Sequence, residues 1–519
     1  MAKILLTLDI LLDAFLGKKE TSKKLVDKLA ESDHDLFITS SIIPALNYFL
    51  TKYGADKKKF KEIFFRRFKI ISTTGYEGIL SLDYEDSEEA LAFFSFKRAV
   101  GDGIVITSDK NYKKFEAEGL KILTPEEALE SPEIFGKDSY ESIPILDLKK
   151  EYHYAIEEID YAILKSVAEA KYILGPEVDE LEKNVAAYLD VKHCIACSSG
   201  TDALTLSLRA LAIKIKKREY WDKDDLIITT PFTFVATGDS ILRSGATPLF
   251  VDIELDTYNL SPLPVKKAVK KYGRRVKGII PVHLYGHPCN MDELLTISKE
   301  NDLFVIEDCA QSFGASWNNK KTGSFGDLGC FSFFPSKNLG GFGDGGMVST
   351  NNDELAEIVR MLIKHGGKDK YNVEHIGYNA RLDTIQAAIL LAKFKYIDKL
   401  NNMRRKIAQI YNEGLKDVEW LKLPAEREKA YHVYHQYTVL LMGKNRKEVQ
   451  EKLKQKGIST MVYYPYPLHK MKVFTDNRMV VFDELRNTEI ASENVLSLPI
   501  EALFNERKIK LVIEALKGC

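Results

Sequence analysis

Two segments place reactive side chains where a parallel α/β sheet would bring them together. Lys337 lies in CFSFFPSKNLGGFGDGG, among aromatic and small residues and directly before a glycine-rich turn. Glu307 and Asp308 follow the apolar run LFVI, which predicts a buried strand. Ligands of such sheets bind at the carboxyl ends of the strands. The lysine and the carboxylates are therefore candidates for one site, although Lys337 alone is equally compatible with a solvated surface lysine.

A third segment adds a candidate anion site. HCIACSSGTDALTLSL predicts a strand that delivers Ser199, Gly200 and Thr201 to the start of a helix. The free N–H groups and positive end of a helix favour phosphate, and glycine permits close approach. The simpler alternative is that Ser199 or Thr201 only caps the helix. Together, a phosphate cradle, a carboxylate at a strand end and a lysine in a glycine-rich setting fit pyridoxal 5'-phosphate.

The composition limits the class of protein. At about 150 residues per domain, 519 residues predict about three domains. Lys+Arg 74 against Asp+Glu 75 leaves a net charge of -1, so nucleic acid is not an expected partner and any polyanion must meet a local site. No run of about 20 apolar residues appears, so we expect no membrane span and a cytoplasmic location.

Cysteine placement argues against disulfides and zinc. None of the six cysteines lies in the first 190 residues. Cys194 and Cys197 form a CxxC pair, but no second pair or nearby histidine pair completes a zinc site. We therefore expect these cysteines to be structural residues of a buried strand, and we predict no metal site.

The chain divides at a region without periodicity, SPEIFGKDSYESIP at 131–144. Before it, short strands at 2–8, 35–39 and 101–109 alternate with charged amphipathic stretches such as 57–68, which predicts an α/β domain over 1–135. After it, strands and helices alternate, which predicts a large, mainly parallel-sheet domain over 143–400. The pattern 383–411 predicts one long helix. Strands near 435–442 and 459–465 predict a small α+β domain over 401–519.

From about Ile143 to the C-terminus the chain resembles the DegT-type sugar-nucleotide aminotransferases, which are fold type I pyridoxal-phosphate enzymes. The matching motifs, in order, are ILGPEVDELE, SSGTDAL, TFVAT, FVDI, PVHLYGHP, IEDCAQSFGA, FSFFPSKNLGGFGDGG, GYNARLDTIQAAIL and VLSLPI. The resemblance implies the same two-domain α/β architecture and a transamination.

The resemblance assigns roles at the cofactor ring. Lys337 matches the lysine that family members link to the cofactor and that moves the proton. Asp308 matches the carboxylate on the pyridine nitrogen, and Gln311 matches the side chain beside the phenolic oxygen. Phe234 stands where the family stacks an aromatic ring on the cofactor; a core phenylalanine is the alternative.

The resemblance also implies a phosphate site that two subunits share. Gly200 and Thr201 match the phosphate cradle, Ser332 adds a hydroxyl, and Ser199 is a neighbouring candidate. Asn379, in GYNARLD, matches an asparagine that the neighbouring subunit contributes. A homodimer with a shared active site is therefore expected.

The resemblance assigns the substrate contacts less directly than the cofactor contacts. His283, Tyr285, Tyr464 and His469 match segments of the family that contact the sugar or diphosphate. The reaction implied is transfer of an amino group from an amino acid, with L-glutamate favoured, to a keto-sugar nucleotide for polysaccharide biosynthesis. Many members have His where this chain has Tyr463, and GEGG where it has GDGG at 343–346. The FFPSKNLGGFGDGG form favours 3-keto over 4-keto sugars.

The first part of the chain resembles a PIN domain, an α/β nuclease fold that gathers acidic residues around a divalent metal. Glu89 and Asp109 match later acidic positions, and Asp13 aligns on the opening helix. However, Thr7 stands where the first aspartate belongs, and Asp9 lies two residues away. An inactive structural or interaction role is therefore favoured over a nuclease.

A different class of function stays open. The chain could be a regulatory or RNA-binding fusion protein in which the PIN-like domain is the functional module and the aminotransferase body a sensor.

Overall fold

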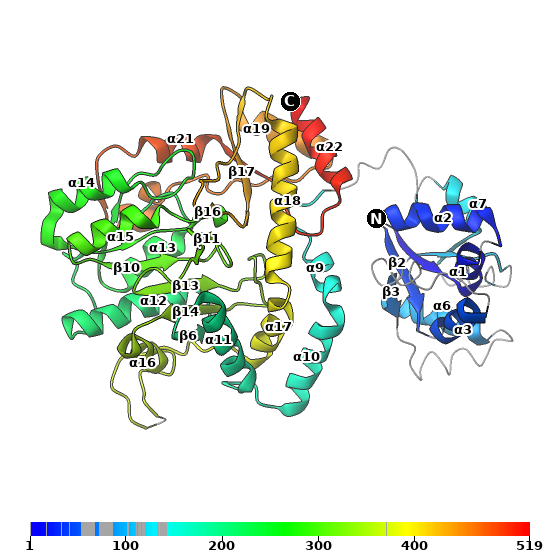
Figure 1. The fold of residues 1–519 in the computed structure, drawn as a ribbon, viewed down its shortest axis with the longest axis horizontal. Coiled ribbons are helices and arrows are strands. Elements are labelled where there is room, and N and C mark those ends of the chain that lie inside the picture. Colours follow the sequence, from blue (N-terminus) through cyan, green and yellow to red (C-terminus); the bar gives the residue numbers. More distant parts are fainter. Residues whose placement is uncertain are drawn as a thin grey trace. The chain divides into compact units, whose positions relative to one another are not determined.

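The computed structural model divides the chain into two compact units, residues 1–141 and 142–519, hereafter the N-terminal and C-terminal units (Figure 1). The residues described are 2–16, 18–32, 34–40, 42–52, 68–71, 87–100, 103–109, 112, 116, 120–131, 134, 143–369 and 371–519. Each unit is described by itself. Among these residues, no helix combines the length and apolar character required to cross a membrane.

The N-terminal unit contains a parallel five-stranded sheet in the order β3-β2-β1-β4-β5. The strands are β1 (Lys3–Leu6), β2 (Asp35–Thr39), β3 (Phe68–Ile71), β4 (Ile104–Ile106) and β5 (Lys121–Leu123). The helices are α1 (Leu8–Phe15), α2 (Glu20–Glu31), α3 (Ile42–Lys52), α6 (Ser87–Val100) and α7 (Pro125–Glu130). The predicted strands within 2–8, 35–39 and 101–109 are confirmed. The amphipathic stretch at 57–68 lies outside the described residues except for Phe68, which opens β3.

Alternate strand residues build a core on each face of this sheet. Ile4 and Leu6 of β1 pack with apolar residues of α1, α2 and α3. Leu5, on the opposite face, packs with Phe93 and Phe96 of α6. This alternation is the period-two pattern expected of a strand covered on both sides.

The C-terminal unit is built on an eight-stranded sheet in the order β18-β8-β7-β9-β10-β13-β14-β6. Its strands are β6 (His193–Cys197), β7 (Leu226–Thr229), β8 (Thr247–Phe250), β9 (Val276–Ile280), β10 (Phe304–Asp308), β13 (Leu328–Ser332), β14 (Gly346–Thr350) and β18 (Val480–Val481). Of these described strands, only β14 runs opposite to the others, so its pairs with β13 and β6 are antiparallel. The mainly parallel sheet predicted from the alternation of strands and helices is confirmed.

Helices cover both faces of this sheet. One face packs against α12 (Gly200–Leu211), α13 (Val235–Arg243) and α16 (Asp353–Leu362). The other face packs against α11 (Pro176–Leu189), α14 (Pro262–Tyr272), α15 (Met291–Glu300) and α17 (Thr384–Phe394). Because helices cover both faces, a ligand can reach polar residues of this sheet at the carboxyl ends of the parallel strands.

The C-terminal part forms a second, smaller sheet. β17 (Tyr437–Leu441) pairs antiparallel with β15 (Leu421–Lys422) and β19 (Val495–Leu498). Its core includes residues of α18 (Ile397–Leu415), α19 (Arg446–Gln455) and α22 (Glu506–Lys517). These elements are the α+β end that the sequence indicates, whereas a separate domain starting at 401 stays a prediction.

Two predicted elements differ from the structure. The single helix expected over 383–411 is two helices, α17 and α18, separated by a turn at Lys395 and Tyr396 (Figure 1). The Tyr396 ring packs on Tyr154 at 5.4 Å and its hydroxyl donates to Glu158, so tertiary contacts fix the break. Residues 459–465 form no strand but one isolated bridge, Met461 to Ser497.

Candidate active site

Asp308 is the last residue of β10 and is buried at the carboxyl end of the sheet. Its Oδ2 accepts a hydrogen bond of 2.8 Å from the Thr237 hydroxyl, and its Oδ1 accepts one of 3.1 Å from the Ala310 N–H. Burial raises the pKa of Asp308, while these two hydrogen bonds and the positive charge of Lys337 oppose the rise. The arrangement holds an oriented carboxyl group that can bind a protonated ring nitrogen.

Lys337 lies in the turn after β13, with its backbone N–H bonded to the Phe334 carbonyl at 2.8 Å. Burial around its amine lowers the pKa of Lys337 to about 8, and the attraction of Asp308 opposes the lowering. A lysine amine in this range is partly unprotonated near neutral pH and can act as a nucleophile or a base.

The glycine-rich turn that follows Lys337 is fastened by α17. Gln386 Oε1 accepts the Phe342 N–H at 2.8 Å, and Lys393 Nζ donates to the Gly340 carbonyl. Close approach requires glycine at position 340, because a Cβ there would clash with the Pro335 carbonyl oxygen. The position of Lys337 is therefore set by contacts from a neighbouring helix as well as by β13.

The start of α12 lies beside the end of β13. Ser199 is the N-cap and accepts the Asp202 N–H at 3.0 Å, so the capping role weighed from sequence is present. The N–H groups of Gly200 and Thr201 occupy the first helical turn, where a helix supplies no acceptor. A Cβ on Gly200 would lie 2.7 Å from the Ser332 Cβ. Glycine thus lets the helix start meet Ser332, and a small anion can bind both.

Phe234 precedes α13 and is 57% exposed. The core phenylalanine considered as its alternative is therefore wrong. Its ring lies 6.2 Å from that of Tyr464, and Phe232, two residues earlier, is the buried member of this segment. Phe234 thus presents an aromatic face that a planar ligand can stack on.

Gln311 connects two of the predicted substrate residues. Its Oε1 accepts the Tyr285 N–H at 2.7 Å, and its Nε2 donates to the Tyr464 hydroxyl at 3.0 Å. Tyr285 is buried, and its own hydroxyl donates to the Tyr463 carbonyl. Tyr464 is partly exposed, whereas the buried Tyr285 holds the backbone at Tyr463.

The prediction that His283 contacts substrate is wrong for this structure. Cys289 N–H donates to His283 Nδ1 at 3.0 Å, so Nε2 carries the proton that it shares with Glu307 at 3.1 Å. Neither side chain has exposed surface. Chain topology explains this: the His283 N–H bonds the Asp308 carbonyl, which directs the imidazole into the interior behind β10.

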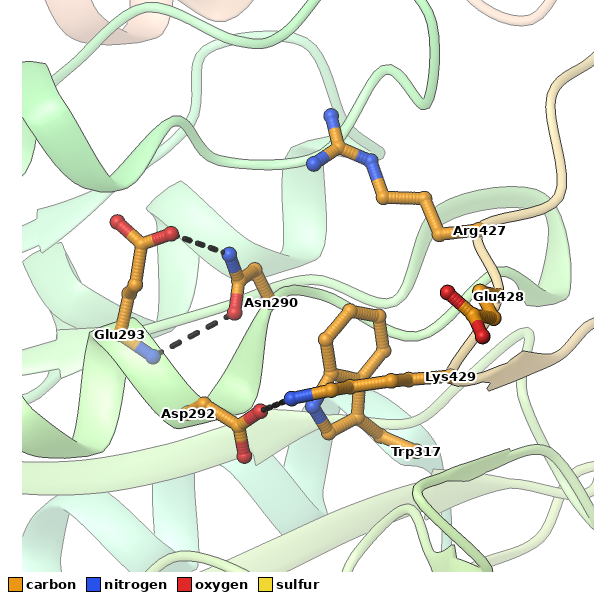
Figure 2. Close-up of a pocket in the computed structure, with 7 residues that line it drawn as sticks. All are labelled: Asn290, Asp292, Glu293, Trp317, Arg427, Glu428 and Lys429. Atoms are coloured by element: carbon orange, nitrogen blue, oxygen red, sulfur yellow. Dashed lines mark hydrogen bonds and ion pairs between the residues drawn. The ribbon is translucent and has the colours of Figure 1, made fainter.

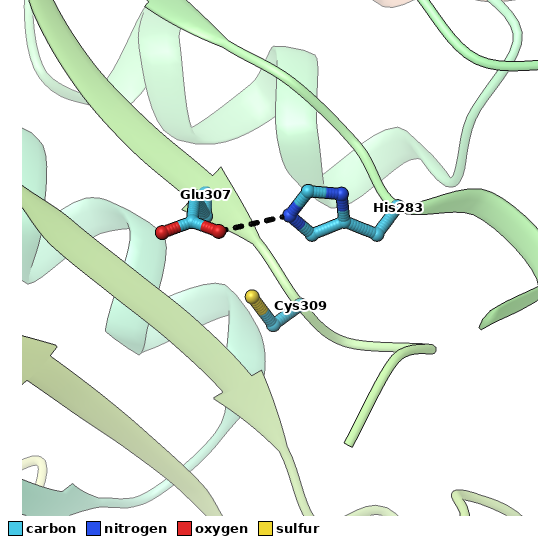
Figure 3. A group of neighbouring side chains, drawn as sticks. All are labelled: His283, Glu307 and Cys309. Atoms are coloured by element: carbon cyan, nitrogen blue, oxygen red, sulfur yellow. Dashed lines mark hydrogen bonds and ion pairs between the residues drawn. The ribbon is translucent and has the colours of Figure 1, made fainter. Parts of the chain in front are cut away.

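His283, Glu307 and Cys309 have donor atoms within 4.8 Å of one another (Figure 3). Their bonding does not suit a metal. Glu307 accepts three backbone N–H groups, from Gly323, Phe325 and Gly326. Burial holds the pKa of the Cys309 thiol well above its ordinary value, so it is not a thiolate ligand. The cluster fixes the strand ends around Asp308 instead.

The two remaining predicted residues, His469 and Asn379, lie in two further segments of the C-terminal unit. His469 is partly exposed, and its Nε2 lies 3.6 Å from Glu489. Asn379 is exposed, and its Oδ1 accepts a hydrogen bond from Arg381. The adjacent Ala380 carbonyl accepts the Ser198 N–H at 3.0 Å, so this segment runs along the end of β6.

Sequence reasoning missed Thr237, the residue that orients Asp308. The available signal is spacing, because Thr237 follows Phe234 by three residues and so shares its side of α13. Gln386 and Lys393 were also missed. They come from α17, and local pattern gives no indication that this helix packs on the glycine-rich turn.

Two acidic residues of α1, Asp9 and Asp13, are engaged by groups of the N-terminal unit. Asp9 accepts the Ser108 N–H at 2.7 Å and a hydrogen bond from the Thr7 hydroxyl, and Asp13 pairs with Lys19 at 3.0 Å. Among the described residues, these carboxylates form no group with metal-ligand spacing. The side chain of Glu89 lies outside the described set.

A surface pocket of about 370 Å³ lies on the C-terminal unit, over Trp317 (Figure 2). It is lined by Asn290, Asp292, Glu293, Trp317, Arg427, Glu428 and Lys429. Its cations are already paired, Lys429 with Asp292 at 2.7 Å and Arg427 with Glu254 at 2.9 Å. These pairings satisfy the charges that could select a ligand, and the lining includes none of the predicted site residues.

Comparison with known proteins covers the C-terminal unit. Residues 154–517 match the DegT/DnrJ/EryC1/StrS aminotransferase family. The chain is 42% identical over 375 residues to a "Pleiotropic regulatory protein" of Geobacillus stearothermophilus, covering 72% of this chain and 97% of that protein.

A second relative and a solved structure agree with this match. The chain is 40% identical over 376 residues to a UDP-N-acetyl-3-dehydro-alpha-D-glucosamine 3-aminotransferase of Acidithiobacillus ferrooxidans, covering 72% of this chain and 97% of the relative. The crystal structure of NtdA from Bacillus subtilis with bound cofactor PMP is similar with a TM-score of 0.65 and 28% identity, covering 79% of this chain and 95% of that one.

Proposed function

Because the chain belongs to the DegT/DnrJ/EryC1/StrS aminotransferase family, we propose that it transfers an amino group to a keto-sugar nucleotide with pyridoxal 5'-phosphate as cofactor. The observation that carries this proposal is the electrostatic coupling of Asp308 and Lys337. A buried, oriented carboxyl group lies within electrostatic range of a lysine amine whose pKa is lowered to about 8. These are the two groups that the cofactor's ring nitrogen and aldehyde require.

The residues present fit this cofactor. The Gly200 and Thr201 N–H groups with Ser332, and Ser199 beside them, suit its phosphate, because the cradle is open only while position 200 lacks a Cβ. Phe234 offers an exposed ring for stacking. Gln311 has an amide N–H near the site, now bonded to Tyr464, that suits an anionic ring oxygen.

When bound, the cofactor supplies an electron sink that stabilises negative charge on the substrate carbon. Asp308 keeps the ring nitrogen protonated. Lys337 would move one proton in each half-reaction: from the donor carbon to the cofactor's aldehyde carbon in the first, and from that carbon to the acceptor carbon in the second. The Phe234 and Tyr464 rings, 6.2 Å apart, would lie beside the bound ring. The same lysine could therefore serve both half-reactions at one site.

The sugar is proposed to be a 3-keto sugar and the donor L-glutamate. The 3-aminotransferase of A. ferrooxidans, at 40% identity, supports the position of amination. The FFPSKNLGGFGDGG turn after β13 supports it as well. Tyr464 and His469 remain the proposed contacts to the nucleotide sugar, since both are partly exposed. Amino-sugar formation for a polysaccharide is the process proposed.

The active form is proposed to be a homodimer in which Asn379 completes the partner's cofactor site. α10 (Ile156–Glu169) supports this, because it exposes a row of large apolar side chains. Tyr161 is 69% exposed and Leu164 68%, on the same side of the helix. A second copy of the chain would remove this row from water.

The direct test is optical and chemical. Purified protein should be yellow after incubation with pyridoxal 5'-phosphate, and L-glutamate should bleach the colour as the amino group is transferred. The Lys337→Ala variant should lose the absorption of the lysine-linked cofactor, because the flanking residues Ser336 and Asn338 offer no amine in its place. Unchanged absorption in Lys337→Ala would refute the assignment of the lysine.

A regulatory role is the second candidate, favoured by the name of the Geobacillus stearothermophilus relative, a "Pleiotropic regulatory protein", and by the N-terminal unit outside the family match. RNA binding or metal-dependent RNA cleavage by the full chain, lost in Asp109→Ala, would support it. Full transaminase activity without any RNA binding would remove it.

A further inference from the structure

Arg209 is a fully buried cation in the last turn of α12, the helix whose start forms the proposed phosphate cradle. Its Nη1 donates to the Tyr378 hydroxyl at 2.8 Å, and its Nη2 donates to the Ile376 carbonyl at 2.9 Å. The Tyr220 ring covers the guanidinium at 4.0 Å. Two of its bonds therefore hold the segment that leads to Asn379.

Glu219 completes this arrangement from the loop after α12. Its Oε2 accepts from Arg209 Nη2 at 2.6 Å, and its Oε1 lies 2.9 Å from His375 Nδ1. The Ile376 N–H also donates to Glu219, at 3.3 Å. Burial raises the pKa of Glu219, but His375 and Arg209 outweigh it and lower the value. The Arg209–Glu219 pair thus binds residues 375–378 through side chains and backbone together.

The same segment is fixed on its other side by backbone contacts. The Tyr378 N–H donates to the Leu362 carbonyl at 2.8 Å, and the Ala380 carbonyl accepts from Ser198 at 3.0 Å. Asn379 lies between these two anchors and is exposed. The ordering of its side chain therefore depends on how firmly residues 375–381 are held.

We propose that Arg209 and Glu219 are positioning residues of the active site, which hold residues 375–381 so that Asn379 reaches the cofactor phosphate of the partner subunit. The inference rests on the proposed function. Removing the guanidinium would leave Glu219, the Ile376 carbonyl and the Tyr378 hydroxyl without their common donor. Lysine cannot replace it, because a single ammonium cannot serve three acceptors with the planar geometry of arginine.

Mixed dimers should respond differently according to which protomer lacks Arg209. A protomer that lacks Lys337 still offers its Asn379 to the partner. Two differently tagged chains are co-purified so that only one protomer keeps Lys337, and Arg209→Met is placed in either protomer. Placed in the Lys337→Ala protomer, Arg209→Met should raise the cofactor Kd of the working site about tenfold or more. Placed in the protomer that keeps Lys337, it should change the Kd by less than about twofold.

Equal loss in both mixed dimers would overturn the inference, because a purely structural role acts within the altered protomer. No loss in either would overturn it as well. Glu219→Gln provides a second variant, which keeps an oxygen for Arg209 but weakens the hold on His375. It should show the same asymmetry with a smaller change in Kd.

Two controls separate this inference from the proposed function. The mixed dimer with Lys337→Ala alone must bind cofactor in its unaltered site, or the proposed function fails first. Asn379→Ala is tested in the same two arrangements. It must weaken cofactor binding at the working site only when it is placed in the Lys337→Ala protomer. If Asn379→Ala acts within its own protomer, the shared site is wrong, and so is the positioning role across the interface.

Discussion

The Thr237 hydroxyl donates a hydrogen bond of 2.8 Å to Asp308 Oδ2, which joins the first turn of α13 to the end of β10. A buried carboxylate is costly unless it is hydrogen-bonded. The Thr237 hydroxyl therefore favours the charged form of Asp308, the form that can hold a protonated ring nitrogen.

Thr237→Val should weaken the cofactor site without altering its shape. A hydrogen bond to a charged group is worth about 1.5–3 kcal/mol, so the cofactor Kd should rise about tenfold or more. The pKa of Asp308 should rise further, which moves the acidic limb of the pH–rate profile to higher pH. Titration of the bound cofactor's absorption measures both effects. Ser240→Ala, on the same helix but with its hydroxyl bonded to the Ala236 carbonyl, is the matched control, and an equal loss there would contradict the assignment.

The pH dependence of cofactor capture should report the Lys337 amine. Only the unprotonated amine attacks the aldehyde, so the second-order rate of colour formation should rise through a pKa of about 8 and level off above it. Asp308→Asn removes the negative charge that opposes the lowering, so the midpoint should move to lower pH. Stopped-flow absorbance over a range of pH measures it. A midpoint that rises in Asp308→Asn would be inconsistent with the geometry.

Gly200→Ala should disrupt the phosphate cradle. The added Cβ would lie 2.7 Å from the Ser332 Cβ, and relief of that clash should cost about 1–3 kcal/mol and move the helix start. Ser332→Gly in the same chain removes the clashing atom and should restore most of the lost melting temperature, but not the phosphate affinity that the hydroxyl supplies. Inorganic phosphate binding and thermal unfolding separate the two outcomes. Unchanged phosphate affinity in Gly200→Ala would argue against the cradle.

Stability should depend on pH through Glu501, away from the cofactor residues. Burial raises the pKa of Glu501 from 4.5 to about 7, so the folded protein binds a proton that the unfolded chain has lost between these values. This contribution to stability is present below about pH 4.5 and is lost as the pH rises to about 7. The cost of ionising Glu501 in the folded state is roughly 3 kcal/mol at most.

Glu501→Gln should therefore unfold at a higher temperature than the parent protein at about pH 8. The difference should shrink towards about pH 5, and calorimetry at the two pH values measures it. Gln can keep the bond that Glu501 Oε2 accepts from the Asp147 N–H, so the substitution isolates the charge. A gain that is larger at the lower pH would have the wrong sign.

The site residues at the strand ends can be predicted from the sequence, because a local pattern marks each of them. Asp308 follows a run of apolar residues, and Gly200 stands between a strand and a helix, so the parallel-sheet rule places both at one edge. The alternation of apolar strands and amphipathic helices likewise predicts the covered sheet. Local pattern was sufficient to predict the sheet with its covering helices. It also predicted residues at or just after the end of a strand, such as Asp308 and Gly200.

Local pattern failed where a distant element decides the outcome. His283 follows a strand like a site residue, but the bond of its backbone to Asp308 turns the ring inward to Glu307. The break at Tyr396 depends on Tyr154 and Glu158, which come from segments far earlier in the chain. Thr237 does not stand out in the sequence, because a threonine in the first turn of a helix commonly bonds to the helix itself.

Lys337 and Asp308 are proposed to support amino transfer to a keto-sugar nucleotide. The most direct measurement incubates the cofactor-loaded protein with L-glutamate labelled with heavy nitrogen and a 3-keto-sugar nucleotide, followed by mass spectrometry of the sugar. We predict an amino sugar that carries the heavy nitrogen, formed by the parent protein and abolished in Lys337→Ala. Absence of labelled amino sugar with both 3-keto and 4-keto acceptors, despite a fully loaded cofactor site, would contradict the account.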